Sequence, residues 1–267
     1  WAEKNRIMTG KVTVKTGPYR YSYMSYLKEI ADCFSKNSPI REVTVMKGVQ
    51  LGFTTGVFEN IIGYSIEYDP CPILFASADK QLIKDFKKVR IDNMIDNSGL
   101  RERIIAETGN VNTRRQGDTS TMLEFIGGFV RFVGPNNEKD LRSFSVKKAL
   151  LDEIDGWKED NSNNKDGDRV ALAVARTNNY SRFRKIGYIS TPVLAHKSRI
   201  NPLFLKGDQR KYLVPCPHCE EKQELVFFER DGGLYPSSEG IKKDGVITKP
   251  YGLLFDSKAC KEGDYSS

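Results

Sequence analysis

The sequence predicts an α/β fold with a mostly parallel central sheet and a small β-rich appendage at its C-terminal end. Three observations lead to this prediction. Strand-like runs alternate with helix-like runs over most of the chain, as in proteins built from strand–helix–strand units. A glycine-containing loop joins one of these strands to the helix that follows it. From residue 207 on, short strand-like pieces stand among many Gly, Lys and Asp residues, which indicates a separate small unit.

The first half of the chain contains two strand–helix units after an initial helix. The amphipathic run SYLKEIADCF predicts that helix at Ser25 to Phe34. The β-branched run REVTVMK at 41–47 predicts a strand, and the stretch from Thr54 to Tyr68 predicts the helix of the same unit. The apolar run PILFASA predicts a second buried strand at 72–78. Apolar residues spaced by three and four then predict a helix over 79–95.

The second half continues the alternation. The run TMLEFIGGFVRFVG at 121–134 consists of two alternating stretches around a Gly-Gly pair and predicts a hairpin. A strand that ends in acids is expected at 146–157, where the sequence reads VKKALLDEIDGW, and another at 185–192, where it reads KIGYISTP. A helix over 169–178 connects them. The polar run at 159–168 is an exposed loop.

Composition limits the class of protein. The 267 residues carry a formal net charge of +7, and 39% of them are hydrophobic, which fits one large domain or two smaller ones. No run of about 18 apolar residues and no leader segment is present, so we expect a soluble, intracellular chain that is a fragment of a longer protein. The positive charge either is simply solvated or suits a polyanion such as nucleic acid. Scattered cysteines with one C-x-x-C indicate a reducing compartment.

The loop KGVQLGFTT at 47–55 resembles a phosphate-binding P-loop with a displaced cation. Such a loop reads G-x-x-x-x-G-K-[ST] between a strand and a helix. Aligned on Gly52 and Thr54, Lys47 stands in the place of the first glycine and Phe53 in the place of the lysine. One interpretation is an ordinary strand-to-helix turn. In the other, Lys47 reaches the β- and γ-phosphates from the start of the loop and Thr54 supplies the hydroxyl that faces Mg²⁺.

The run ALLDEID makes the second interpretation the better one. An apolar strand that ends in adjacent acids supplies Asp152 to hold Mg²⁺ and Glu153 to orient and activate a water. Both carboxylates are expected at the carboxyl edge of the sheet, where open α/β sheets bind ligands. A polar turn after a core strand is the alternative. The loop and the acidic strand together favour nucleotide hydrolysis.

The order of these motifs resembles a known family, the large terminase subunits of lambda-like tailed phages (the GpA family), which are DNA-packaging motor proteins. The resemblance spans nearly the whole chain. It starts at WAEKN, passes through IREVTVMKGVQLGFTT, LRSFSVKKALLDEIDGW and GYISTP, and ends with SRI and GDQRKYLVPCPHCEEKQEL. The C-x-x-C shortly after Ser-Thr-Pro is its most specific part, because generic helicases do not carry one there. The resemblance implies a RecA-like P-loop ATPase of the ASCE type.

The resemblance also implies roles for individual residues. Family members place the catalytic lysine at the beginning of a deviant phosphate-binding loop, and Lys47 matches that position. Thr54 and Asp152 are then the Mg²⁺-side residues, and Glu153 is the catalytic carboxylate. The Ser-Thr-Pro run matches the motif that couples hydrolysis to DNA movement and consists of Ser190, Thr191 and Pro192. The nucleotide-binding loop as a whole comprises Lys47, Gly48, Val49, Gln50, Leu51, Gly52, Phe53, Thr54 and Thr55.

Two other expected features are an arginine and an adenine-binding element. Arg142, in KDLRSFS, matches an arginine that the family places shortly before the acidic strand. It would stabilise charge near the γ-phosphate, in cis or from a neighbouring subunit, or else form a surface ion pair. Arg182 and Arg184 are weaker candidates for that role. Where such ATPases carry an aromatic–glutamine element for adenine, the run SYLKEI offers Tyr26 but has leucine in place of glutamine.

The C-terminal part carries half of a zinc site. Cys216 and Cys219 have the spacing of one ligand pair, whereas a closed tetrahedral site needs four ligands. The family supplies its second pair further along, beyond Ser267. Cys260 and His218 could replace that pair, although no spacing argument points to either. We therefore expect a P-loop ATPase domain over 1–206. Over 207–267 we expect a partial zinc-ribbon-like or linker segment that leads to an absent nuclease domain, and no nuclease activity.

The hypothesis is thus an ATPase motor of a viral terminase that uses ATP and Mg²⁺ to translocate double-stranded DNA. The resemblance implies a small terminase subunit, a portal protein and a homo-oligomeric ring as partners, and a location in the host cytoplasm at the procapsid portal. Two rivals remain. A helicase-like translocase shares the loop and the acidic strand but needs a second RecA-like domain. A non-catalytic zinc and nucleic-acid-binding module with a decayed P-loop would bind DNA regardless of ATP.

Overall fold

The computed structural model describes residues 1–78, 80–105, 118–119, 121–134, 144–157, 168–194, 197–215, 220–223, 241–243 and 246–248. The chain divides into two compact units, Trp1–Gln209 and Arg210–Ser267, and each is described by itself.

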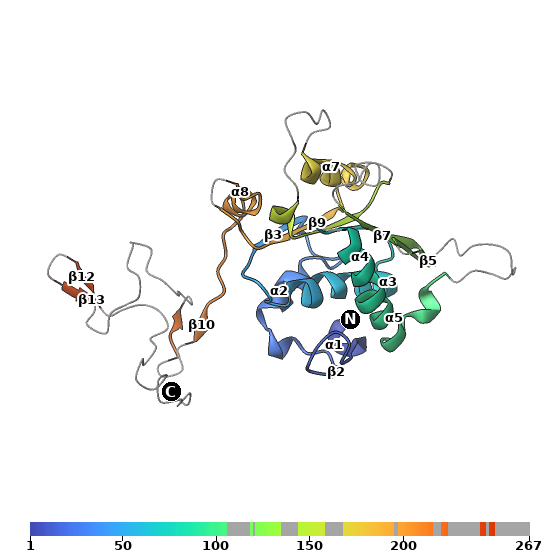
Figure 1. Ribbon diagram of the computed structural model, residues 1–267, viewed down its shortest axis with the longest axis horizontal. Helices are drawn as coiled ribbons and strands as arrows, with labels where there is room; N and C mark the ends of the chain where they lie inside the picture. Colours follow the sequence, from blue (N-terminus) through green and yellow to red (C-terminus); the bar gives the residue numbers. More distant parts are fainter. Residues whose placement is uncertain are drawn as a thin grey trace, which may run out of the picture. The chain divides into compact units, whose positions relative to one another are not determined.

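The first unit is built on a mixed sheet. Within the described residues, seven strands follow the order β3-β9-β8-β4-β7-β6-β5 (Figure 1). The strands from β3 to β7 run parallel, and β6 and β5 join the edge antiparallel, so the predicted mostly parallel sheet is confirmed. The strands are β3 (Glu42–Met46), β4 (Pro72–Ala76), β5 (Asp118–Thr119), β6 (Met122–Phe125), β7 (Gly128–Val133), β8 (Lys148–Asp152) and β9 (Lys185–Ser190).

Helices cover both faces of this sheet. Figure 1 shows α2 to α5 on one face and α7 and α8 on the other. Burial follows the period of two along the strands, since Ile73 and Phe75 of β4 face one core and Leu74 and Ala76 face the other. The helices are α2 (Tyr26–Asp32), α3 (Asn60–Tyr68), α4 (Lys80–Phe86), α5 (Asp92–Asn97), α7 (Arg169–Ala175) and α8 (Ile200–Lys206).

Most predicted elements are present, with local differences in type. The helix expected from Thr54 begins as a π-helical segment, η2 (Thr54–Glu59), before α3. The helix expected over 79–95 is interrupted between α4 and α5 by a second π-helical segment, η3 (Lys87–Ile91). In the predicted β6–β7 hairpin, Gly127 adopts a φ of +85°, a conformation that favours glycine.

Several short elements were not predicted from the sequence. They have little apolar periodicity of their own, and their strands pair with distant or very short partners. They are α1 (Ala2–Asn5), β1 (Ile7–Met8), β2 (Gly17–Pro18), the 3₁₀ turns η1 (Tyr21–Tyr23), η4 (Arg101–Arg103), η5 (Ile154–Gly156) and η6 (Asn178–Tyr180), and helix α8.

The second unit contains two antiparallel strand pairs in its described part. β10 (Val214–Pro215) pairs with β11 (Lys222–Gln223), and β12 (Ile241–Lys243) pairs with β13 (Val246–Thr248). In the part of the chain that the structure describes, no helix has the length and apolar character that crossing a membrane requires.

The sheet order brings distant motifs to one edge. β9 lies between β3 and β8, so the strand before the glycine loop and the acidic strand are separated by the strand that ends in Ser190. All three strands are parallel, and their carboxyl ends therefore meet at the same edge of the sheet.

Candidate active site

Lys47 leaves β3 and turns its ammonium group toward the ends of β8 and β9. Its N–H donates to the carbonyl of Ser190 at 3.0 Å, which extends the pairing of β3 with β9 by one residue. Its Nζ donates to Glu153 Oε1 at 2.6 Å and to Thr191 Oγ1 at 3.2 Å. The Lys47 side chain is only 6% exposed, whereas Glu153 is 40% exposed. The lysine at the start of the loop therefore contacts two of the other predicted site residues.

The rest of the loop explains why the usual lysine position can hold an aromatic residue. Phe53 is buried, and its ring lies 5.7 Å from the ring of Tyr26. The Tyr26 hydroxyl donates to the carbonyl of Leu51 at 2.9 Å. Gln50 and Gly52 both adopt positive φ, at 56° and 71°. Phe53 thus anchors the loop to α2, and the described loop contributes its one ammonium group through Lys47.

Asp152 and Thr54 form the second contact of the site. The Thr54 hydroxyl donates to Asp152 Oδ2 at 2.9 Å, although the two residues lie 98 positions apart. Asp152 is 5% exposed, and its Oδ1 has no hydrogen-bond partner among the described residues. Its backbone carbonyl accepts from the indole of Trp157 at 3.0 Å. A buried carboxylate oxygen without a partner beside a hydroxyl is what a divalent cation with oxygen ligands requires.

Burial also determines the protonation of Asp152. Desolvation raises the pKa of its carboxyl group to about 7, and the hydrogen bond from Thr54 opposes this shift. The neighbouring Glu153 carboxylate raises this pKa further, and the Lys47 ammonium lowers it. A bound cation would favour the charged form of this carboxylate.

Glu153 is held in an unusual backbone conformation. Its φ and ψ are both 50°, in the left-handed region that non-glycine residues rarely adopt. Its N–H donates to the Ile189 carbonyl at 2.7 Å, and its Oε2 accepts from the N–H of Thr191 at 3.2 Å. The end of β9 therefore fixes both the backbone and the side chain of Glu153. Such local strain is common at functional sites.

The Ser-Thr-Pro run is in direct contact with these groups. Ser190 is fully buried, and its hydroxyl accepts from the Asp155 N–H at 3.0 Å and donates to the Thr191 carbonyl at 3.2 Å. Thr191 contacts both Lys47 and Glu153, as described above, and Pro192 follows it directly. The structure thus brings the predicted coupling motif next to the predicted catalytic carboxylate.

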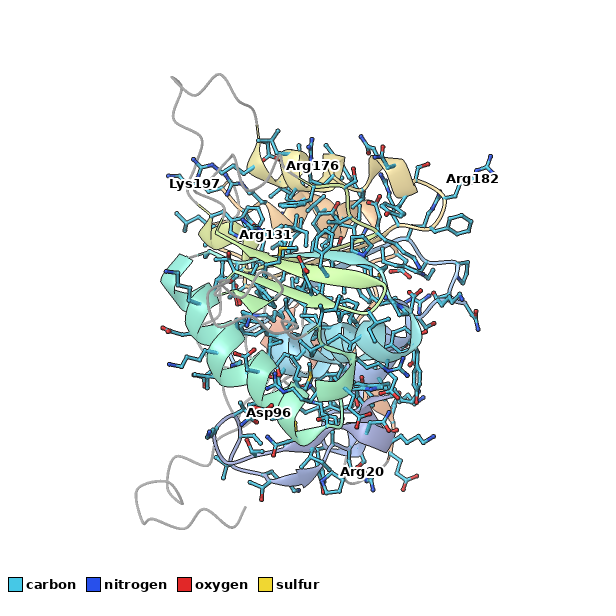
Figure 2. All side chains as sticks on the ribbon, turned by 90° about the vertical axis from the view of Figure 1, so that its right-hand side faces the viewer. Arg20, Asp96, Arg131, Arg176, Arg182 and Lys197 are labelled. Atoms are coloured by element: carbon cyan, nitrogen blue, oxygen red, sulfur yellow. The ribbon has the colours of Figure 1, made fainter. Side chains whose placement is uncertain are left out.

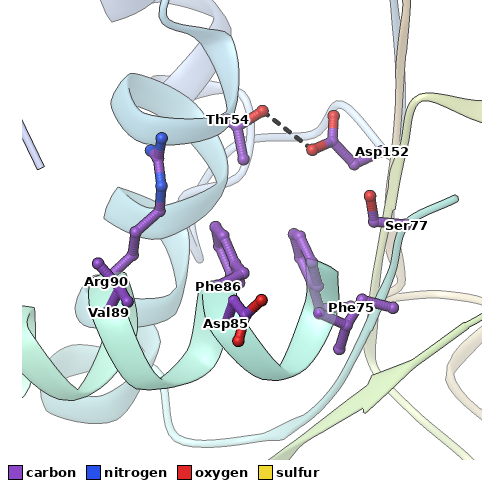
Figure 3. Close-up of a pocket in the computed structure, with 9 residues that line it drawn as sticks. Thr54, Phe75, Ser77, Asp85, Phe86, Val89, Arg90 and Asp152 are labelled. Atoms are coloured by element: carbon purple, nitrogen blue, oxygen red, sulfur yellow. Dashed lines mark hydrogen bonds between the residues drawn. The ribbon is translucent and has the colours of Figure 1, made fainter. Parts of the chain in front are cut away.

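A cavity of about 370 Å³ opens beside the Thr54–Asp152 pair (Figure 3). Phe75 and Phe86, whose rings stack at 4.5 Å, form part of its wall, together with Ser77 after β4. Arg90 on η3 also lines it and donates to the Thr55 hydroxyl at 2.6 Å. Nothing in the sequence distinguishes Arg90, because its spacing on a helix gives no sign of which strand it faces.

Other predicted residues lie outside this cluster. Arg184 precedes β9 and pairs with Glu42 at the start of β3, at the opposite edge of the sheet from Lys47. Arg182 is exposed in the turn before β9 and points outward (Figure 2). The structure therefore assigns neither arginine to the site.

Some predictions fall on residues that the structure does not describe. These are the arginine candidate Arg142 and the two cysteines of the half zinc site, Cys216 and Cys219. Among the described residues, no group of three or more His, Cys, Asp or Glu side chains is arranged to hold a metal ion. Zinc binding therefore has no support from the structure.

A mostly parallel α/β sheet with a glycine loop, a hydroxyl–carboxylate pair and a glutamate at its carboxyl edge is the arrangement expected of a RecA-like P-loop ATPase domain. Residues 13–243 match the family model described as phage terminase large subunit gpA, ATPase domain, and the chain belongs to that family. The resemblance and the fold class inferred from the sequence are thereby confirmed.

Two individual proteins illustrate the similarity. The large terminase subunit of Enterobacteria phage P21 is 25% identical over 230 residues, which are 85% of this chain and 34% of that protein. The chain thus spans about a third of the length of this relative. The crystal structure of the HK97 bacteriophage large terminase superposes with a TM-score of 0.56 and 11% identity, over 87% of this chain and 44% of that one. At this identity the superposition supports the fold alone.

Proposed function

We propose that the first unit is the ATPase motor domain of a viral terminase large subunit, which hydrolyses ATP to move double-stranded DNA into procapsids. In this proposal residues 1–206 carry the ATPase and 207–267 connect it to the nuclease portion of a longer protein. The observation that carries this proposal is that four motif residues from two strand ends and one helix start meet in pairs, Lys47 with Glu153 and Thr54 with Asp152.

Thr54 and Asp152 fit the role of Mg²⁺-side residues. The unpartnered Asp152 Oδ1 is a buried acceptor that a cation would satisfy, and the Thr54 hydroxyl lies within hydrogen-bond distance of the same carboxylate. Bound with ATP, Mg²⁺ would neutralise charge on the phosphate oxygens. Asp152 would keep its carboxylate ionised for this purpose, and Trp157 would hold its backbone in place.

In this proposal Lys47 binds the phosphates and Glu153 activates the attacking water. In the structure Lys47 and Glu153 form an ion pair, so each neutralises the charge of the other. When the triphosphate binds, Lys47 would exchange Glu153 for the phosphate oxygens, since both offer anionic oxygens to an ammonium on a flexible side chain. Glu153 would then align the attacking water and accept its proton, while the N–H of Thr191 keeps its carboxylate oriented.

The partners belong to the proposal as well. The net charge of +7 supports a polyanionic partner, which we take to be double-stranded DNA. The family supports a small terminase subunit, a portal protein and a homo-oligomeric ring at the procapsid portal in the host cytoplasm. We also propose that these 267 residues do not cut DNA, and Mg²⁺-dependent cleavage by the purified chain would contradict this.

Calorimetric titration with Mg²⁺-ATP tests the proposal directly. We expect the wild type to bind and Lys47→Ala to lose at least about tenfold in affinity, because it removes a charge-assisted contact to phosphate. Lys4→Ala is the matched control, since Lys4 is an exposed lysine on α1 and should bind as the wild type does.

Each result separates the proposal from a rival. A wild type that binds DNA but not Mg²⁺-ATP would favour the non-catalytic binding module. Duplex unwinding driven by ATP would favour the helicase-like translocase. The ordered contacts of Lys47 with Glu153 and Thr191 argue against a decayed loop, because a loop without function would have no reason to keep a buried ammonium at this edge.

A further inference from the structure

The acidic turn after β8 contains a third carboxylate that the proposed mechanism does not use. Asp155 lies two residues after Glu153, in η5. Its Oδ2 accepts from the N–H of Val193 at 3.1 Å, and its Oδ1 accepts from the N–H groups of Arg199 and Ile200, both at 2.8 Å. One carboxylate therefore satisfies three backbone donors in the segment that follows the Ser-Thr-Pro run.

Glu153 and Asp155 accept hydrogen bonds from alternate residues of the segment that follows β9. Glu153 accepts from the N–H of Thr191 and Asp155 from that of Val193, while Pro192 between them has no N–H to donate. The turn itself is tight, since the N–H of Gly156 donates to the Glu153 carbonyl at 2.9 Å. Glu153 and Asp155 are therefore joined by a short, hydrogen-bonded piece of backbone.

The far end of this connection is the start of α8. The Arg199 guanidinium donates to the carbonyls of Trp157 at 2.6 Å and Ile154 at 3.3 Å, so hydrogen bonds run in both directions between the turn and the helix. Ile200 is fully buried in the same core as Trp157. α8 ends at Lys206, and the second compact unit begins at Arg210.

We propose that Asp155 is the positioning residue that transmits the nucleotide state of the site to α8. This inference rests on the proposed function. When Glu153 exchanges Lys47 for the attacking water, the turn shifts and Asp155 carries its backbone partners Val193, Arg199 and Ile200 with it. Charge-assisted hydrogen bonds to backbone N–H groups are stronger than neutral ones, so the three that Asp155 accepts hold its partners to the acidic turn. Ser190 and Thr191 are then the part of the coupling element next to the nucleotide site, and Asp155 with α8 is the part further from it.

Amide hydrogen exchange on the whole chain tests this inference. The protein is compared with Mg²⁺-ADP and with Mg²⁺ and the β,γ-imido analogue of ATP, and exchange is followed in peptides over 47–56 and 197–206. We expect both peptides of the wild type to differ between the two nucleotides. In Asp155→Ala, the difference at 197–206 should be lost while that at 47–56 remains.

Two further variants separate transmission from mere stability. Asp168 caps α7 by accepting from the N–H groups of Val170 and Ala171, so Asp168→Ala removes a similar carboxylate cap away from the acidic turn. It should keep the nucleotide-dependent difference at 197–206. Asp155→Asn keeps an acceptor for Arg199 and Ile200 but loses the charge, and it provides a folded variant if alanine is not tolerated. We expect it to reduce the difference at 197–206.

The outcomes are distinguishable. If the wild-type peptide over 47–56 does not respond to nucleotide, the proposed function itself fails. A response at 47–56 without one at 197–206 would overturn the role of Asp155 and leave the ATPase proposal intact. So would an unchanged difference at 197–206 in both Asp155 variants, or its equal loss in Asp168→Ala.

Discussion

Two buried carboxylates lie in or beside the helical segment that follows the glycine loop, and they differ in how their charge is compensated. Glu59, at the end of η2, is fully buried and paired on both oxygens, with Arg6 at Oε2 and Arg90 at Oε1. Asp152, facing the start of η2, is almost as buried but holds a single hydroxyl hydrogen bond from Thr54 and has one oxygen without a described partner.

The difference separates a structural carboxylate from one prepared for a ligand. A buried carboxylate with two guanidinium partners has its charge compensated inside the protein. Asp152 lacks such compensation in the described structure, and burial raises its pKa to about 7, so near neutral pH its carboxyl group is only partly ionised until a cation arrives. We therefore expect substitutions at Asp152 to affect chemistry and substitutions at Glu59 to affect folding.

The largest expected effect is on hydrolysis by Asp152→Asn. Without the carboxylate the Mg²⁺-side of the site is lost, and we expect the rate of ATP hydrolysis to fall at least about 100-fold. The melting temperature should stay the same or rise, because the substitution removes a poorly compensated buried charge. Asp85→Asn is the control, since Asp85 lines the same cavity from an exposed position. A comparable loss of rate in that control would mean that the cavity as a whole, rather than Asp152, is responsible.

The second effect concerns folding and falls on Glu59→Gln. This substitution leaves the Arg6 guanidinium, whose side chain is 2% exposed, without its anion. We expect the free energy of unfolding in urea to drop by about 3 kcal/mol, as is typical when one partner of a buried ion pair is removed. Glu102→Gln changes an exposed acid of η4 and should cost little. If Glu59→Gln were as stable as the wild type, the contrast between the two carboxylates would disappear.

The pH dependence of stability sharpens the comparison further. The Asp152 carboxyl has an ordinary pKa of 3.8 and a folded-state value of about 7, so between these values the folded protein binds more protons than the unfolded chain. In the absence of nucleotide and Mg²⁺, its contribution to the free energy of unfolding should therefore decrease as pH rises from about 4 to about 7, by up to about 1.4 kcal/mol per pH unit.

Denaturant titrations at several pH values measure this slope. Asp152→Asn should remove the contribution, whereas Glu59→Gln should keep it on a lower baseline. If the pH dependence of the free energy of unfolding were the same in Asp152→Asn and in the wild type, a group other than Asp152 would be taking up the proton.

The sequence predicted the elements of the site far better than their arrangement. Periodicity located the four strands that carry or flank the motifs to within a few residues, because each is a short apolar run with turn residues at its ends. It did not give the order β3-β9-β8-β4, since strand order depends on contacts between residues that are far apart in the chain, such as Glu42 of β3 and Ile186 of β9. Lys47 and Glu153 are separated by 106 positions, and the sequence did not predict their ion pair.

The residues that sequence reasoning missed share a physical feature. Arg6, Arg90 and Asp155 act through partners that are distant in the chain or are backbone groups, so neither spacing nor residue type reveals them. Phe53 is the opposite case, since it was noted in the sequence only as the residue that replaces the usual P-loop lysine. Its burial against Tyr26 gives the substitution a packing role.

The smallest expected effect concerns Arg90, which stands between the two carboxylates. Its Nη1 donates both to Glu59 Oε1 at 3.0 Å and to the Thr55 hydroxyl at 2.6 Å, and its side chain is 37% exposed. Arg90→Lys keeps the charge but not the planar group that serves both acceptors, and we expect it to cost about 1 kcal/mol of stability. Because Arg6 still neutralises Glu59, this loss should be smaller than that of Glu59→Gln.

A double-mutant cycle between Arg90→Lys and Glu59→Gln in urea shows whether the two residues act together. A coupling free energy between the two substitutions, with an unchanged rate of hydrolysis, would mean that Arg90 serves the structural carboxylate Glu59. A fall in the hydrolysis rate that exceeds the small change in stability would place it with Asp152, whose cavity it lines. Glu59 would then connect folding to chemistry, because the arginine that compensates its charge would also serve the site.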